Sequence, residues 1–442
     1  MKVTRIWATA LVLGCAGGGI VSTTEASAQE SAITAAKDRT RKEPASAEAA
    51  VAHARALRRA GREADALVEL RRGQIFAKGD AAITAEWEIA RTHIAKRDFA
   101  AAMASCKSVA KLPNGKAAGH VCAAEAHLLW RRGTEALAEL AQLAELAKTS
   151  GANANADVLF HAKLAEGRSR ELDSKDSEAE ACYREAIRIA PGRFEGHLLL
   201  GAMLHRIGKE GIPALRRAVE LDPHDPIAQL ELGRALASEP AQRADAVAAF
   251  EKAVAERPSF VEALRALTEA YVAASRLADA KRVAASVLKI APNDVLAHVV
   301  SGRVALAEGK PDDALREGEI ALKLMPNEGK AKLLVADAYA KKGEVDLALE
   351  AYQKASGLDP LDPAPLVNAT QVCLAAGRVT SAKAFGQRAV LDFPNHAPAW
   401  VAQGDALAAD GNPKAARSAY ESAKKAKGAD LTLIEGKLSR LR

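Results

Sequence analysis

The sequence predicts an all-α solenoid, in which short helices pair and each pair packs against the next. Proline recurs at Pro191, Pro223, Pro258, Pro292, Pro326, Pro360 and Pro394, at steps of 32, 35, 34, 34, 34 and 34 residues. A period near 34 is typical of helix–turn–helix arrays. Aromatic residues make up only 4% of the 442 residues. That composition suits many thin helix–helix contacts better than one large core.

One unit of this period, Gly329–Pro360, shows why two helices are expected. The spacing predicts a first helix over Lys330–Lys342 and a second over Val345–Ser356. Gly343 lies between them and can adopt a turn conformation that strains other residues. Pro360 cannot continue a helix and ends the unit. The apolar positions are Leu333, Val335, Ala336 and Tyr339 in the first helix, and Ala348, Leu349, Tyr352 and Ala355 in the second.

These units resemble tetratricopeptide repeats. The matching residues are Gly343, Ala348, Tyr352, Ala355 and Pro360, and then Trp400, Gly404, Gly411, Ala416, Tyr420 and Ala423. The resemblance implies a right-handed superhelical solenoid of about eleven repeats with a C-terminal capping helix. It also suggests an exported bacterial protein of this family. The repeats are expected to begin near Ala47, Ile83, Gly119, Phe160, Phe194, Pro226, Val261, Val295, Gly329, Pro363 and Ala397.

Residues 1–28 have the pattern of an export signal. Lys2 and Arg5 form a charged start, Ile6–Val21 is apolar, and Ala26–Ala28 offers small residues for cleavage before Gln29. We therefore predict a periplasmic or secreted protein.

A lipoprotein is the alternative. Val12–Cys15 resembles a lipoprotein cleavage box, in which Cys15 would be lipidated. The chain would then be an outer-membrane lipoprotein and would contact a membrane only through that anchor.

The rest of the chain divides into four predicted segments. Residues 29–46 are polar and are expected to form a flexible linker. Residues 47–150 form a basic N-terminal lobe of three degenerate repeats, and 151–429 a main array of eight. Residues 430–442 are expected to cap the last apolar surface. The apolar face of this cap is Leu431, Ile434, Leu438 and Leu441.

The charge is uneven along the chain. Its formal net charge is +6, and Val51–Arg132 holds fifteen basic and eight acidic residues. A basic lobe of this kind favours an acidic partner. Stacking aromatics do not interleave these basic residues, so nucleic acid is not expected. The sequence offers no catalytic constellation and no metal-ligand spacing. We predict a non-enzymatic protein without cofactor or metal.

The resemblance also implies that the first helices line an inner groove. Arginine binds carboxylates through two parallel hydrogen bonds, so a ladder of arginines there suits an acidic peptide. The predicted ladder is Arg55, Arg91, Arg168 and Arg234, and the predicted aromatic anchors are Trp87 and Trp130. The function expected is a protein–protein interaction scaffold of the bacterial cell envelope. The alternative is an accessory protein of polysaccharide export or cell-wall assembly that binds an anionic glycan.

Two cysteines fall on helices that should be neighbours. Cys106 is expected on the second helix of one unit and Cys122 on the first helix of the next. An oxidising compartment would permit a disulfide between them, and strict geometry could equally prevent it. Cys182 and Cys373 are expected to be buried small apolar residues.

Overall fold

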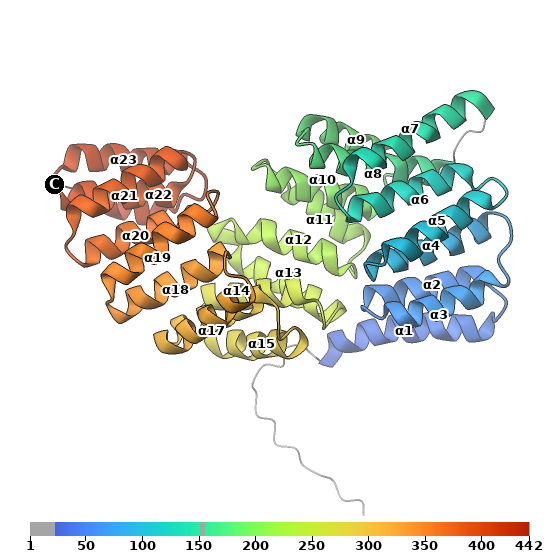
Figure 1. The fold of residues 1–442 in the computed structure, drawn as a ribbon, viewed down its shortest axis with the longest axis horizontal. Helices are drawn as coiled ribbons and strands as arrows, with labels where there is room; N and C mark the ends of the chain where they lie inside the picture. The colour runs from blue at the N-terminus through green and yellow to red at the C-terminus, as the bar shows by residue number, and fades with distance from the viewer. Residues whose placement is uncertain (1–22, 151–154, 442) are drawn as a thin grey trace, which may run out of the picture.

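A computed structural model describes residues 23–150 and 155–441, which form 24 α-helices and one short 3-10 helix. The helices pair along the chain into a continuous array (Figure 1). The predicted fold class, an all-α repeat solenoid, is confirmed.

Eleven helix pairs make up the array. The first helices are α2 (Ala47–Arg59), α4 (Asp80–Ala95), α6 (Lys116–Leu129), α8 (Ala156–Leu172), α10 (Phe194–Arg206), α12 (Pro226–Ala237), α14 (Val261–Ala273), α16 (Val295–Ala307), α18 (Gly329–Lys342), α20 (Ala364–Ala375) and α22 (Ala397–Ala409). The second helices are α3 (Glu63–Gln74), α5 (Phe99–Lys111), α7 (Gly133–Ser150), α9 (Asp176–Ile189), α11 (Ile212–Leu221), α13 (Arg243–Glu256), α15 (Leu277–Ile290), α17 (Pro311–Leu324), α19 (Val345–Leu358), α21 (Val379–Asp392) and α23 (Pro413–Lys425). The 3-10 helix η1 (Pro240–Gln242) precedes α13.

Three first helices begin earlier than the sequence period predicts. The expected starts Ile83, Gly119 and Phe160 lie inside α4, α6 and α8. At α8 the cause is a cap: the side chain of Asn155 accepts a hydrogen bond from the backbone N–H of Val158 at 2.9 Å. Capping by asparagine fixes a helix start. The period therefore locates these repeats, while local capping sets their ends.

The predicted linker is wrong for most of its length. Residues from Thr23 to Lys42 form helix α1, which packs against α2. Ile33 is only 4% exposed and joins a cluster with Val51 and Leu57. Thr40 lies on the same side of the helix as Ile33 and is also buried. Its hydroxyl donates to the carbonyl of Ala36 at 2.8 Å. Two buried residues seven positions apart suffice to dock an otherwise polar helix. Most of the predicted export signal, Cys15 included, lies outside the described residues.

Glycine allows the two helices of a unit to approach closely. Gly343 has φ of +79°, so the turn after α18 uses the left-handed region that favours glycine. At Gly404 the constraint is contact rather than φ. A Cβ atom there would lie 2.4 Å from the ring of Tyr420 on the paired helix. The motif residues thus fix both the turn and the spacing of a pair.

The last helix, α24 (Leu431–Arg440), covers the end of the array. Ile434 is fully buried against Tyr420 and Ala423. Nζ of Lys437 donates to the carboxylate of Asp405 at 2.7 and 2.9 Å. This helix therefore takes the place that the first helix of another repeat would occupy.

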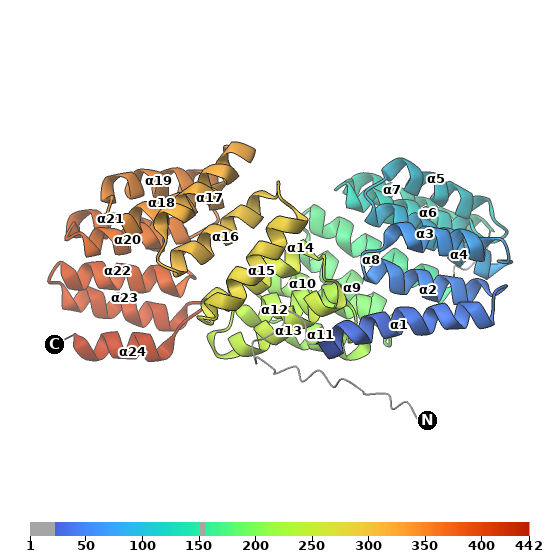
Figure 2. The ribbon, with the colours of Figure 1, turned by 90° about the horizontal axis from the view of Figure 1, so that it is seen from below.

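The first six repeats close on themselves. Arg59, at the end of α2, pairs with Asp222 at the end of α11. Arg257, after α13, donates to Glu63 at 3.2 Å. Helix α1 also contacts α13, and the two lie side by side in Figure 2. We call residues 47–260 the N-terminal ring, 261–425 the C-terminal arm, and the contact of repeat 1 with the ends of repeats 5 and 6 the seam. Repeats of a solenoid ordinarily contact only their neighbours, so the seam is an exception.

Candidate partner-binding cavity

The inner side of the N-terminal ring holds a cavity of about 530 Å³. Its wall comes from the first helices of repeats 1 to 6, with the start of α3 and the end of α13 completing it. The charged lining residues are Arg55, Arg58, Arg59, Arg91, Arg168, Arg193, Arg257, Glu63, Glu88, Glu125, Glu195 and Asp225. Between them lie apolar side chains, among them Leu164, Leu198 and Ile227. The wall is thus amphipathic, with arginine as its commonest charged residue.

Glu88 is the centre of one buried charge cluster. Its side chain is only 3% exposed and has three arginine partners, Arg55 at 2.9 Å, Arg58 at 2.7 Å and Arg91 at 3.2 Å. Burial alone would raise the pKa of Glu88, but the three guanidinium groups hold it well below its usual range. The carboxylate is therefore ionised, and it binds three arginines of the wall in place.

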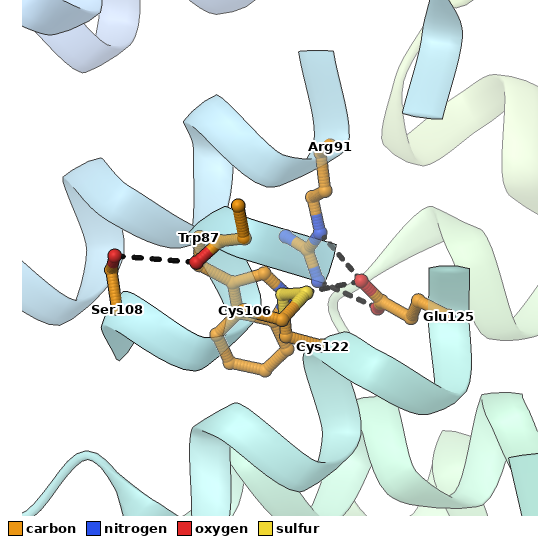
Figure 3. Close-up of a disulfide and its surroundings, with 7 residues drawn as sticks. Trp87, Arg91, Cys106, Ser108, Cys122 and Glu125 are labelled. Atoms are coloured by element: carbon orange, nitrogen blue, oxygen red, sulfur yellow. Dashed lines mark hydrogen bonds and ion pairs between the residues drawn. A yellow bond between two sulfur atoms is a disulfide. The ribbon is translucent and has the colours of Figure 1, made fainter. Parts of the chain in front are cut away.

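Glu125 forms a second cluster one helix further on. Its carboxylate accepts from Arg91 at 2.8 and 3.0 Å and from the indole N–H of Trp87 at 2.9 Å. Burial would raise the pKa of Glu125, while Arg91 and His161 lower it well below its usual range. Figure 3 shows the Arg91–Glu125 pair. Arg91 also lies over the ring of Trp87, 4.6 Å from its centroid.

His161 links these clusters to the next repeat. Its Nε2 lies 3.0 Å from a guanidinium nitrogen of Arg193, and its Nδ1 lies 3.2 Å from Glu125. Because a guanidinium only donates, Nε2 accepts and Nδ1 carries the proton. Burial, followed by the charge of Arg91, lowers the pKa of His161. The neutral ring thus relays a hydrogen bond from Arg193 to Glu125.

The predicted arginine ladder is only partly free to bind. Arg55, Arg91 and Arg168 line the same cavity. Arg55 and Arg91 are held by Glu88 and Glu125, as described above. Arg168, on α8, is exposed, and within residues 23–150 and 155–441 its guanidinium makes no hydrogen bond or ion pair. Among the four arginines predicted, Arg168 is the one whose guanidinium faces the cavity without a partner in the described chain.

Arg234 lies elsewhere. It pairs with Glu231 at 2.5 Å and lines a second cavity of about 420 Å³ between α12, α14 and α16. The floor of that cavity includes Ala266, Ala270 and Val299. The ladder predicted from the sequence is therefore split between two sites.

The predicted tryptophan anchors do not line the cavity. Trp87 is 4% exposed and packs beneath Arg91, so a partner could not reach its ring. That expectation is wrong because the indole is used to hold Glu125. Trp130 ends α6 and contacts the ring of Phe99, with centroids 4.8 Å apart. It therefore supports a helix pair.

The sequence itself contains a signal that predicts these charge clusters. The two hydrogen-bonded pairs Arg55–Glu88 and Arg91–Glu125 are separated by 33 and 34 residues. That separation is the repeat period, which places equivalent positions of successive first helices side by side. Arginine followed by glutamate one period later predicts such a pair. This rule identifies Glu88 and Glu125. It does not identify His161 and Arg193, because their contacts do not join an arginine to a glutamate one period later.

Cys106 and Cys122, for which the sequence left a bridge open, form a disulfide in the structure. It joins α5 to α6, and the Cα atoms are 5.4 Å apart. Both cysteines are buried in one apolar cluster with Trp87. The bridge lies near the Arg91–Glu125 pair (Figure 3) and fixes the repeats that carry it.

Residues 23–150 and 155–441 contain no group of three or more His, Cys, Asp or Glu side chains placed to hold a metal ion. In the same residues every helix is too short or too polar to cross a bilayer.

Comparison with protein families identifies the repeat. Residues 300–363 and 373–430 match one tetratricopeptide-repeat model, and residues 241–299 match another. These stretches of the chain are tetratricopeptide repeats. The matches cover the C-terminal arm and the last second helix of the ring, where the motif residues are best kept. No curated protein sequence matches the chain.

Solved structures with similar folds include yeast Tom70, which is 13% identical over 89% of this chain and 94% of that one, with a TM-score of 0.48. A tetratricopeptide repeat protein from Parabacteroides merdae is 14% identical over 64% of this chain and 98% of that one, with a TM-score of 0.42. A thermophilic TPR protein of Thermus thermophilus is 26% identical over 41% of this chain and 99% of that one, with a TM-score of 0.37.

Proposed function

We propose that this tetratricopeptide-repeat scaffold binds an extended, acidic segment of a partner protein in the cavity of the N-terminal ring. The observation that carries the proposal is Arg168, a cation on the cavity wall that no residue of the described chain pairs. The other wall arginines are fixed by Glu88, Glu125 and neighbouring carboxylates, so they form a rigid positive surround. Leu164 and Leu198 beside Arg168 offer apolar contact to the rest of the segment.

The chemistry of the site favours a carboxylate. A planar guanidinium donates two parallel hydrogen bonds to a carboxylate, and such charge-assisted bonds are stronger than neutral ones. A rigid surround lowers the entropy lost on binding. The partner chemistry we propose is therefore a peptide segment that carries a glutamate or aspartate side chain, with apolar residues on either side.

The envelope is the proposed setting. The charged, apolar and small-residue pattern of residues 1–28 supports export. The Cys106–Cys122 disulfide supports it as well, because disulfides persist in oxidising compartments. The intact mass of the protein from its host would test this. A soluble species that begins at Gln29 would support export by cleavage, a lipidated species that begins at Cys15 would support the lipoprotein route, and an uncleaved chain would contradict both.

The binding proposal is tested by charge reversal at Arg168. A fluorescein-labelled peptide of alternating glutamate and leucine residues is the probe, and fluorescence anisotropy measures its Kd. We expect Arg168→Glu to weaken binding by about tenfold or more, the equivalent of one lost charge-assisted hydrogen bond. Arg316→Glu is the matched control, since Arg316 is an exposed arginine of α17 with a local partner, Asp313, far along the chain from the cavity.

Three results would contradict or redirect the proposal. Equal weakening by Arg168→Glu and Arg316→Glu would mean that the peptide binds through net charge alone. Unchanged affinity in both variants would place the peptide elsewhere. If oligogalacturonate binds and the peptide does not, with the loss confined to Arg168→Glu, the site takes an anionic glycan instead.

A further inference from the structure

The seam and the cavity share residues. Arg59 and Glu63 of repeat 1 line the cavity, and so does Arg257, which follows repeat 6. The same three side chains make the seam ion pairs, Arg59 with Asp222 and Arg257 with Glu63. The wall of the cavity thus runs from repeat 1 to repeat 6 and returns to repeat 1 only through the seam. Opening the seam would turn a closed ring into an open groove.

The seam is held differently from every junction beside it. The buried apolar cluster of repeat 1 contains Ile33, Val51 and Leu57, and the large cluster that includes repeat 6 runs from Leu198 to Val304. Among the described residues, these two clusters share no member. Successive repeats, by contrast, are joined by continuous apolar clusters such as the second one. Apolar burial therefore holds each repeat to the next, while repeat 1 meets the other side of the ring through charged side chains, next to the contact of α1 with α13.

Charged contacts of this exposure are weak. The side chains of Arg59 and Arg257 are 43% and 30% exposed, while their carboxylate partners Asp222 and Glu63 are 14% and 18% exposed. Ion pairs that solvent reaches contribute little to stability and are screened by salt. Opening the seam should therefore cost less free energy than unfolding a repeat. Gly61 permits the close approach, because it adopts φ of +75° and a Cβ there would lie 3.0 Å from Nε of Arg257.

We propose that the Arg59–Asp222 and Arg257–Glu63 pairs form a latch, which opens the N-terminal ring and controls access of an extended segment to its cavity. For the identity of that segment the inference rests on the proposed function. The latch itself rests on the seam alone. An extended chain longer than the cavity must either thread through a closed ring or enter when the ring is open. Entry of the segment through the open seam should be faster than threading through the closed ring.

Two charge reversals at the same ion pair separate opening from charge. Arg59→Asp faces Asp222 with a like charge, and Asp222→Lys faces Arg59 with a like charge, so both should break the seam. They change the charge near the cavity in opposite directions. Arg59→Lys keeps the ion pair and is the conservative control. Hydrogen exchange of the full exported chain measures opening, and stopped-flow fluorescence measures the association rate of the glutamate–leucine peptide.

If the seam is a latch, both reversals raise exchange at the facing ends of α2, α3, α11 and α13, while α19 to α23 are unchanged and Arg59→Lys matches the native protein. Both reversals then raise the association rate by roughly two- to fivefold, the factor that one exposed ion pair represents. Raising the salt concentration should increase exchange at the same helix ends of the native protein.

Two results would overturn the latch. Unchanged exchange in both reversals would show that the seam is held by something other than these pairs. Raised exchange with association rates that move in opposite directions would show that charge, and not opening, governs entry. Raised exchange in both reversals with no peptide binding to any variant would support the latch and would contradict the proposed ligand instead.

Discussion

The N-terminal ring and the C-terminal arm are made of the same helix pair and are stabilised by different contacts (Figures 1 and 2). In the arm, glycine and tyrosine of the motif pack together, and Tyr352 and Tyr420 donate to Asp337 and Asp405 at 2.6 Å within their own repeats. In the ring, buried carboxylates such as Glu88 bind arginines from neighbouring repeats.

Repeats that lack the motif residues need other contacts to join their helices. The first three repeats lack the motif tyrosine of the second helix, which is kept at Tyr183 in repeat 4 of the ring and at Tyr352 and Tyr420 in the arm. A disulfide and two buried charge clusters join α2, α4, α5 and α6 instead. These contacts depend on particular partners. A change to one of them should affect the ring alone, and a change to Gly404 or Tyr420 should affect the arm alone.

The largest expected effect is in the ring. Glu88→Ala would leave Arg55, Arg58 and Arg91 without their shared buried partner, and removal of one member of a buried ion pair costs about 3–5 kcal/mol. Urea unfolding measures it through Trp87 and Trp130, in a chain whose other tryptophans, Trp7 and Trp400, are replaced by phenylalanine.

The control for Glu88 is an exposed carboxylate in the arm. Asp346 pairs with Arg378, and its side chain is 84% exposed. Asp346→Ala should leave the stability nearly unchanged, because an exposed ion pair contributes little. Equal losses in the two variants would show that the ring does not depend on its buried charges.

A smaller effect is expected in the arm. Gly404→Ala would place a Cβ atom 2.4 Å from the ring of Tyr420, and overpacking of this kind costs about 1–3 kcal/mol. Gly436→Ala in α24 is the control, because a Cβ there meets no atom within 4 Å. That control should be stabilising by about 0.5–1 kcal/mol, the helical preference for alanine. Thermal unfolding followed by Trp400 compares the two, and a stabilised Gly404→Ala would contradict the packing argument.

The smallest effect concerns the seam. Gly61 and Gly309 both have φ of +75°, so alanine costs each about 1–2 kcal/mol of backbone strain. Gly61 faces Arg257 at 3.0 Å, whereas a Cβ at Gly309 meets nothing within 4 Å. We expect Gly61→Ala to raise hydrogen exchange across the seam and Gly309→Ala to leave it unchanged. Identical exchange at the seam in both variants would mean that close approach at Gly61 is not needed.

Much of the architecture could be predicted because it is local and periodic. Seven of the eleven predicted repeat starts, from Ala47 to Ala397, coincide with the first residue of a helix. Proline, the turn glycine and apolar spacing act within one repeat, so one sequence suffices to find them. The helix over Thr23–Lys42 could not be predicted as easily. Its segment is polar, and the two residues that dock it, Ile33 and Thr40, are recognisable only once α2 is in place.

The candidate site was predicted less well than the fold. Helical spacing correctly placed Arg55, Arg91 and Arg168 on one concave wall. It did not show that Glu88 and Glu125 already bind the first two, or that Trp87 is covered. Pairing across repeats depends on which side chains reach one another, and only part of it follows the period.

The sequence by itself determined the repeat and its period, because short-range contacts that recur every 34 residues set both. Tertiary structure alone decided that repeat 1 meets the ends of repeats 5 and 6. The small rotation from each repeat to the next accumulates along the array, and no local residue reports its sum. The Arg59–Asp222 pair spans 163 residues, so only the folded curvature brings its two charges together.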